Sequence, residues 1–208
     1  RATEAAARGA VGDAVRAVSA WTSEGETAIT PEDAEELWAI RHAASPILAR
    51  LPETHRSMQV IEDGVVPVSR LADYVRLVRR VTRAHGLGAV IFGHAGDGNI
   101  HVNLLVDTTQ AEWEARVTTV LQEVSAGTVA LGGTLSGEHG DGRLRADALE
   151  AVFGPELMAL FRAIKVAFDP AGILNPGIKL PGGGAPIARL KVGAAAAAQI
   201  HPHSFRHY

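Results

Sequence analysis

Apolar residues recur at helical spacing in several stretches of the chain. The alanine-rich stretch 4–21 predicts a first helix. A second helix is predicted over 30–44, because Thr30 can cap it through its hydroxyl group and acidic residues fill its first turn, and it is expected to end near Pro46. A third helix is predicted over 69–83, followed by a glycine that suits a helix end.

The segments that follow alternate between strand and helix patterns. In 99–106, Asn99, His101 and Asn103 point one way and the apolar residues between them point the other, as in a half-buried strand. Further strands are predicted at 58–66, 89–92 and 132–136, a helix at 108–126, and more helices after 146. The resulting order is that of a ferredoxin-like antiparallel sheet with helices packed on one face. The predicted fold class is α+β, with additional C-terminal helices.

This pattern divides the chain into three parts. Residues 1–29 are expected to form an N-terminal helix and linker, residues 30–181 the main domain, and residues 182–208 a flexible tail. The tail combines glycine, an alanine run and three histidines without an apolar period. The chain opens on arginine rather than methionine, so we expect a fragment of a larger functional unit.

Composition narrows the possible functions. The 208 residues include 20 Lys plus Arg against 23 Asp plus Glu, without the basic excess typical of nucleic-acid binding. With no cysteine, a metal would need histidine and carboxylate ligands. Because no apolar run reaches the ~20 residues that span a bilayer, we expect no membrane span and a cytoplasmic protein, peripheral to the inner membrane at most through partners.

Two histidines flank a predicted hairpin turn. Asp97-Gly98 is a preferred pair for a two-residue type I′ turn, which would place His94 directly opposite His101. Two imidazoles so placed can share one metal ion, and Asn103 on the same face can hydrogen-bond a ligand held there. The alternative is that both histidines only satisfy local hydrogen bonds.

A glycine-rich segment follows at 136–142. Its spacing matches no phosphate-binding motif. Glu138 could complete a two-histidine, one-carboxylate metal site with open positions, beside which His139 could act as an acid or base. A third segment, 169–177, reads as two proline-fixed turns around an apolar pair and by itself implies no chemistry.

Taken together, the segments 93–101, 137–140 and 169–177 resemble the C-terminal domain of FAD-linked oxidases of the vanillyl-alcohol-oxidase type. That group includes D-lactate dehydrogenase, the glycolate oxidase flavin subunit and D-2-hydroxyglutarate dehydrogenase. The similarity covers most of residues 30–180 and is closest to bacterial versions fused to an iron–sulfur part.

The resemblance implies a role for each matching residue. His94, His101 and Glu138 would be ligands of a divalent metal such as zinc, manganese or iron, and His139 the catalytic base. The other matching positions are Arg41, Ser45 and Asn103 at the substrate and Asn175 near the flavin. Electrons would pass to an iron–sulfur, quinone or cytochrome acceptor.

Two departures from the family pattern matter. Ile61 stands where dicarboxylate-specific relatives carry a lysine, so a second substrate carboxylate lacks an obvious partner. The FAD-binding domain that precedes this domain in the family is absent, so FAD would be bound mainly by another domain or subunit.

The predicted function is therefore the substrate- and metal-binding domain of an FAD-dependent dehydrogenase that oxidises a small D-2-hydroxy acid such as D-lactate. The alternatives are a non-catalytic assembly subunit or truncated remnant of such a flavoprotein, and a flavin-independent metallohydrolase using the same ligands. Retention of the histidine and glutamate cluster argues against an assembly role.

Overall fold

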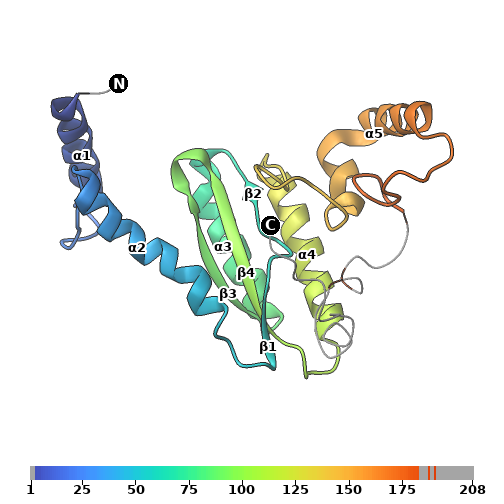
Figure 1. Cartoon of the computed structure of the whole chain (residues 1–208), viewed down its shortest axis with the longest axis horizontal. Coiled ribbons are helices and arrows are strands. Elements are labelled where there is room, and N and C mark those ends of the chain that lie inside the picture. The colour runs from blue at the N-terminus through green and yellow to red at the C-terminus, as the bar shows by residue number, and fades with distance from the viewer. Residues whose placement is uncertain (1–2, 183–186, 188–189, 191–208) are drawn as a thin grey trace, which may run out of the picture. The chain divides into compact units, whose positions relative to one another are not determined.

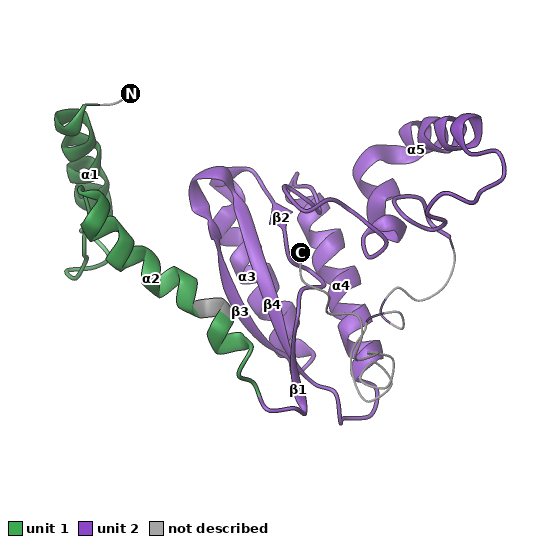
Figure 2. Cartoon of the chain, viewed as in Figure 1, with its two compact units in different colours: residues 1–51 green, residues 52–208 purple. Residues whose placement is uncertain are grey.

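The computed structural model describes residues 3–182 together with 187 and 190, except the side chains of residues 44 and 45. Most of the predicted tail, 182–208, lies outside the described residues. The chain forms two compact units, Arg1–Leu51 and Pro52–Tyr208 (Figure 2). No described helix is both long and apolar enough to cross a membrane.

The first unit holds two helices, α1 (Glu4–Val18) and α2 (Pro31–Leu48). The backbone N–H of Asp33 donates to the Thr30 hydroxyl at 3.2 Å, so the predicted start of the second helix is confirmed. Its predicted end is wrong, because Pro46 lies inside α2 rather than after it.

The second unit is built on an antiparallel sheet (Figure 1). Its strands are β1 (His55–Met58), β2 (Gly64–Val65), β3 (Gly88–His94) and β4 (Asn99–Asp107). β4 pairs with β3 along one edge and with β1 and then β2 along the other. The predicted last strand is reduced to a single bridge between Thr134 and Val65. The spatial order Thr134, β2, β4, β3 is the ferredoxin-like order, and the α+β prediction is confirmed.

Two helices cover one face of this sheet. They are α3 (Leu71–Ala84), entered through a 3-10 turn, and α4 (Trp113–Ala130). Their apolar residues form one core with alternate residues of β4: Ile100, Val102, Leu104 and Val106. Because side chains alternate along a strand, Asn99, His101 and Asn103 point to the opposite face. β4 therefore presents apolar side chains to the core and polar side chains at 99, 101 and 103 to the opposite face.

α4 begins later than the sequence predicts. The Asp107 carboxylate accepts hydrogen bonds from both the N–H and the hydroxyl of Thr109, which folds this segment into a turn before the helix. After α4, a loop leads through a 3-10 turn (Ala146–Ala148) to α5 (Leu149–Phe168). α5 is kinked at Gly154, which has a φ of 76° and is followed by Pro155.

The two faces of β4 generate a stability prediction. Leu104 is fully buried in the core, whereas its neighbour Leu105 is half-buried on the other face. Leu104→Ala should lower the free energy of unfolding by about 2–5 kcal/mol, because it removes packed methyl groups and leaves a cavity. Leu105→Ala, the matched control, should cost clearly less. Urea unfolding monitored by circular dichroism measures both, and equal losses would contradict the assigned core face.

Candidate functional site

The β3–β4 hairpin brings His94 and His101 together, but not in the predicted register. His94 lies opposite Asn99, and Phe92 lies opposite His101. The predicted direct pairing of His94 with His101 is therefore wrong. The reason is the connection, residues 95–98, which forms a 3-10 turn and not a two-residue turn.

The register shift nevertheless preserves the site. A shift of two residues returns each side chain to the same face, because the side-chain period of a strand is two. The ring centroids of His94 and His101 are 5.3 Å apart, with their planes nearly perpendicular. Gly98 closes the turn at φ 71°, where an added Cβ would lie 2.0 Å from the Val66 carbonyl oxygen. Sequence reasoning thus identified the shared face but not the turn.

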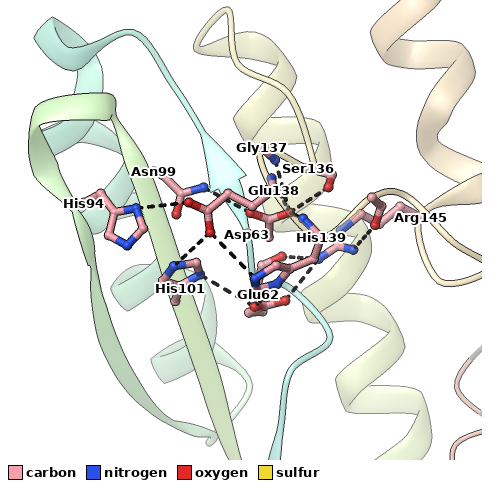
Figure 3. Close-up of polar contacts among 11 residues, drawn as sticks. Glu62, Asp63, His94, Asn99, His101, Ser136, Gly137, Glu138, His139 and Arg145 are labelled. Atoms are coloured by element: carbon pink, nitrogen blue, oxygen red, sulfur yellow. Dashed lines mark hydrogen bonds and ion pairs between the residues drawn. The ribbon is translucent and has the colours of Figure 1, made fainter. Parts of the chain in front are cut away.

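Glu138 joins the two hairpin histidines from the loop after α4 (Figure 3). Its Oε1 lies 3.2 Å from Nδ1 of His94, and its Oε2 lies 3.8 Å from Nε2 of His101. Nε2 of the adjacent His139 lies 3.7 Å from the same Oε2. Three predicted histidines from two distant segments therefore converge on the Glu138 carboxylate.

Asp63 fixes the position of that loop. Its carboxylate accepts hydrogen bonds from the Ser136 hydroxyl at 2.6 Å and from the His139 backbone N–H at 2.8 Å. Further bonds come from the backbone N–H groups of Gly137 and Glu138, at 3.1 Å each. From β4, the Asn99 amide donates to it at 3.0 Å. One side chain thus ties the loop that carries Glu138 and His139 to the strand that carries His101.

Asp63 is fully buried, and its φ is 80°, in the left-handed region. Burial would raise the pKa of its carboxyl group, but the hydrogen bonds from Ser136, His139, Asn99 and Glu138 outweigh this and hold the pKa well below its usual range. Gly137 allows the close approach, since a Cβ there would lie 2.8 Å from the Asn99 amide nitrogen and 2.4 Å from Val65. The loop therefore rests on a buried carboxylate that is ionised.

Glu62 is a second buried carboxylate, 8% exposed, and it faces the histidines. Its Oε1 lies 2.5 Å from Nδ1 of His139 and 3.6 Å from Nδ1 of His101. Its Oε2 lies 3.5 Å from Arg145, whose guanidinium also donates to the Glu62 backbone carbonyl and, at 2.8 Å, to that of Gly140. The rings of His101 and His139 are stacked, with centroids 5.5 Å apart and planes within 10°. Glu62 therefore contacts both stacked imidazoles from one side.

The donors form two overlapping sets that could each hold a metal ion. In one set, ligand atoms of His94, His101 and Glu138 all lie within 4.8 Å of one another, and in the other so do those of Glu62, His101 and His139. The first set fits a divalent metal such as zinc, manganese or iron, which accept imidazole and carboxylate ligands together. The buried Nδ1 of His101 has no hydrogen-bond partner among the described residues. Oε1 of Glu62 faces this atom at 3.6 Å, just beyond hydrogen-bond distance.

The other four predicted site residues are divided between the two units. Asn103 is on the same face of β4 as His101 and is 2% exposed. Arg41 is half-buried on α2 in the first unit, and the side chain of Ser45 lies outside the described residues. Asn175 is in the loop after α5, where it lines an apolar cavity of about 650 Å³ with residues that include Phe168 and Ile178. Of the six predicted positions in the second unit, five therefore share one neighbourhood.

Sequence reasoning missed Glu62, Asp63 and Arg145. From sequence, the segment 60–67 is only part of a predicted strand and the place of a missing lysine at Ile61, which proves to be a core residue. A usable signal was present, because two adjacent acidic residues enclosed by apolar ones are seldom buried without partners. Arg145 has no such signal, since it contacts Glu62 from 83 residues away.

Histidine and carboxylate groups gather at the face of the sheet that lies opposite the core. This arrangement defines a candidate metal site on a ferredoxin-like domain. The comparisons with known proteins identify the family of this domain. The sequence model of the family "FAD linked oxidases, C-terminal domain" matches residues 1–178, and the chain belongs to this family. The resemblance predicted from its three motifs is confirmed.

Curated relatives carry names from the same group. The chain is 38% identical over 152 residues to the glycolate oxidase subunit GlcD of Bacillus subtilis, covering 73% of this chain and 32% of the relative. It is 37% identical over 160 residues to D-2-hydroxyglutarate dehydrogenase of Escherichia coli, covering 77% and 16%. It is 40% identical over 121 residues to D-lactate dehydrogenase of Archaeoglobus fulgidus, covering 57% and 26%. The chain thus spans about a third or less of these relatives.

Among solved structures, the fold is similar to 4-ethylphenol oxidase from Gulosibacter chungangensis in its isoeugenol complex. The TM-score is 0.51 at 20% sequence identity, and the match covers 73% of this chain and 31% of the oxidase. At this level of identity the likeness supports the fold alone.

The role of Asp63 gives a pH-dependent prediction. Asp63→Asn should lower the free energy of unfolding by about 1–3 kcal/mol at pH 7, because it replaces a buried anionic acceptor with an amide. The pKa of Asp63 is lower in the folded chain than in the unfolded one. The advantage of the wild type is therefore fully present above about pH 4 and lost as the pH falls through the folded pKa.

Urea unfolding of both proteins between pH 7 and pH 2 measures this difference. The control is Asp97→Asn, which changes an exposed carboxylate in the β3–β4 turn and should leave stability within about 0.5 kcal/mol of the wild type. A difference between Asp63→Asn and the wild type that does not change with pH would contradict the ionised state assigned to Asp63.

Proposed function

We propose that this chain is the substrate- and metal-binding domain of an FAD-dependent dehydrogenase that oxidises a small D-2-hydroxy acid, such as D-lactate, to the 2-oxo acid. His94, His101 and Glu138 would hold a divalent metal, and His139 would act as the base. The observation that carries the proposal is the convergence of three imidazoles on the Glu138 carboxylate, at 3.2, 3.8 and 3.7 Å. Family membership and the names of the curated relatives support it.

The chemistry divides between the chain and the groups it would hold. A divalent metal, when bound, would favour ionisation of the substrate hydroxyl group, and FAD would accept the hydride from Cα. Nε2 of His139 would take the hydroxyl proton, so that loss of one proton and one hydride converts the alcohol to a ketone. Asn103 and Arg41 are proposed to hold the substrate, Arg41 through the carboxylate and Asn103 through its buried amide.

The remaining assignments stay predictions. Ser45 is proposed to contribute a hydroxyl group to the substrate, and Asn175 to lie near the flavin. FAD would be bound mainly by a domain or subunit other than this chain. The acceptor of the electrons is expected to be an iron–sulfur, quinone or cytochrome partner. The chain itself is expected to be cytoplasmic, peripheral to the inner membrane at most through such partners.

Metal analysis tests the first part of the proposal. The purified chain should bind about one divalent metal ion, and the double variant His94→Ala/His101→Ala should bind none, because two of three ligands are removed. His85→Ala is a matched control, since His85 pairs with Glu123 on the surface at 2.9 Å. A folded wild-type chain that binds no added zinc, manganese or iron(II) would contradict the metal site and favour an assembly role.

The proposed role of His139 gives a different pattern. In the FAD-loaded holoenzyme, His139→Ala should lower kcat for D-lactate by about 10²–10⁴-fold, the usual contribution of a positioned base. Metal affinity should change much less, because His139 is not among the three proposed ligands. Steady-state kinetics and calorimetric zinc titration measure the two effects. An equal loss of turnover and of metal affinity would contradict the division of roles between His139 and the metal ligands.

A further inference from the structure

We propose that Glu62 is a positioning residue that orients two imidazoles at once, the proposed metal ligand His101 and the proposed base His139. The distances among Glu62, His101 and His139 do not depend on the proposed function, but the roles of the two histidines rest on it. Glu62 would accept a hydrogen from Nδ1 of His139, which lies 2.5 Å away, and from Nδ1 of His101 once that contact shortens from 3.6 Å, so that Nε2 of each ring is free to act on the opposite side.

The geometry begins with one oxygen atom. Oε1 of Glu62 lies 2.5 Å from Nδ1 of His139 and 3.6 Å from Nδ1 of His101 (Figure 3). The rings are stacked, with their planes within 10° of parallel. Both Nε2 atoms in turn lie near Oε2 of Glu138, at 3.8 Å for His101 and 3.7 Å for His139. Each imidazole thus bridges one buried carboxylate and one that is half exposed.

The environment of Glu62 keeps its oxygen atoms in place. The side chains of Glu62 and Arg145 are each 8% exposed, and the guanidinium contacts both the carboxylate and the backbone carbonyl of Glu62. Because Arg145 cannot lose its proton, a positive charge always faces Oε2. An ionised carboxylate can only accept hydrogen bonds. Oε1 therefore faces both Nδ1 atoms and lies within hydrogen-bond distance of the one in His139.

This arrangement selects one tautomer of each histidine. A neutral imidazole carries its hydrogen on one nitrogen only, so a hydrogen on Nδ1 leaves a lone pair on Nε2. For His101 that lone pair is what a metal ion needs, and for His139 it is what a base needs. Histidine ligands of metals commonly donate their other N–H to a carboxylate in this way. Glu62 would serve two functional histidines with one oxygen atom.

A competing role for Glu62 is direct metal ligation. Glu62, His101 and His139 also form a compact donor set. In that case Nδ1 of His139 would carry a lone pair toward the metal, and the hydrogen would sit on Nε2. The two roles therefore predict opposite tautomers of His139.

The test is nitrogen NMR of the metal-free chain with ¹⁵N-labelled histidine, recorded at about pH 9, well above the ordinary imidazole pKa of about 6.5. The wild type should show Nδ1-protonated rings for His101 and His139, assigned by comparison with single histidine variants. In Glu62→Gln, the amide oxygen can stay with Arg145 and the amide N–H₂ would then face the imidazoles. The hydrogen on His139 should therefore move to Nε2. Glu62→Asp, which keeps a carboxylate, should restore the Nδ1-protonated form at least in part.

Glu123→Gln is the matched control, because Glu123 also pairs with a histidine but at the surface, away from this cluster. It should leave both tautomers unchanged. Calorimetric titration with zinc gives an independent readout, in which Glu62→Gln should weaken binding by about 10–100-fold and Glu123→Gln should have no effect.

The outcomes separate the two proposals. A wild-type His139 that is protonated on Nε2, or a tautomer that does not respond to Glu62→Gln, would overturn the role of Glu62 even if zinc binds normally. Zinc affinity unchanged in Glu62→Gln would overturn the part that concerns His101. A wild-type chain that binds no zinc but shows the expected tautomers would contradict the proposed metal site and leave the orientation by Glu62 standing.

Discussion

The buried carboxylate of Asp63 is the interaction on which the rest of the site depends. An ion without a neighbouring cation is costly to bury unless hydrogen-bond donors replace its hydration shell. Here the donors come from Ser136, Asn99 and the backbone N–H groups of residues 137–139. The cost of burial is met only if the loop adopts this one conformation. The requirement to solvate Asp63 therefore determines where Glu138 and His139 lie.

Strand β4 connects this arrangement to the stability of the domain. β4 contributes Leu104 and its apolar neighbours to the core on one face and His101 to the site on the other. A displacement of β4 would disturb both faces together, because the two sets of side chains alternate on one backbone. His101 consequently stands on the central, most buried strand of the sheet, and a strand holds a side chain more precisely than a loop does.

The limits of sequence reasoning follow from the range of the interactions. The ferredoxin-like order and the common face of His94 and His101 depend on local periodicity, which a sequence displays directly. The hairpin register depends on which type of turn forms. Asp97-Gly98 favours a two-residue turn, but here the pair lies within the longer connection 95–98. The contacts of Asp63 with the loop and of Glu62 with Arg145 span 73 to 83 residues of chain. No spacing rule links residues that far apart, so their partnership became visible only in the fold.

Glu62 and Asp63 show how two adjacent carboxylates can be buried for different purposes. Asp63 is surrounded by donors from the loop and holds its backbone, whereas Glu62 is paired with Arg145 and faces imidazole side chains. The left-handed backbone at Asp63 turns the two side chains toward different partners. The preceding Ile61 packs in the core. A change at position 61 would therefore alter packing first, and it is the residue at 62 whose chemistry reaches the proposed base.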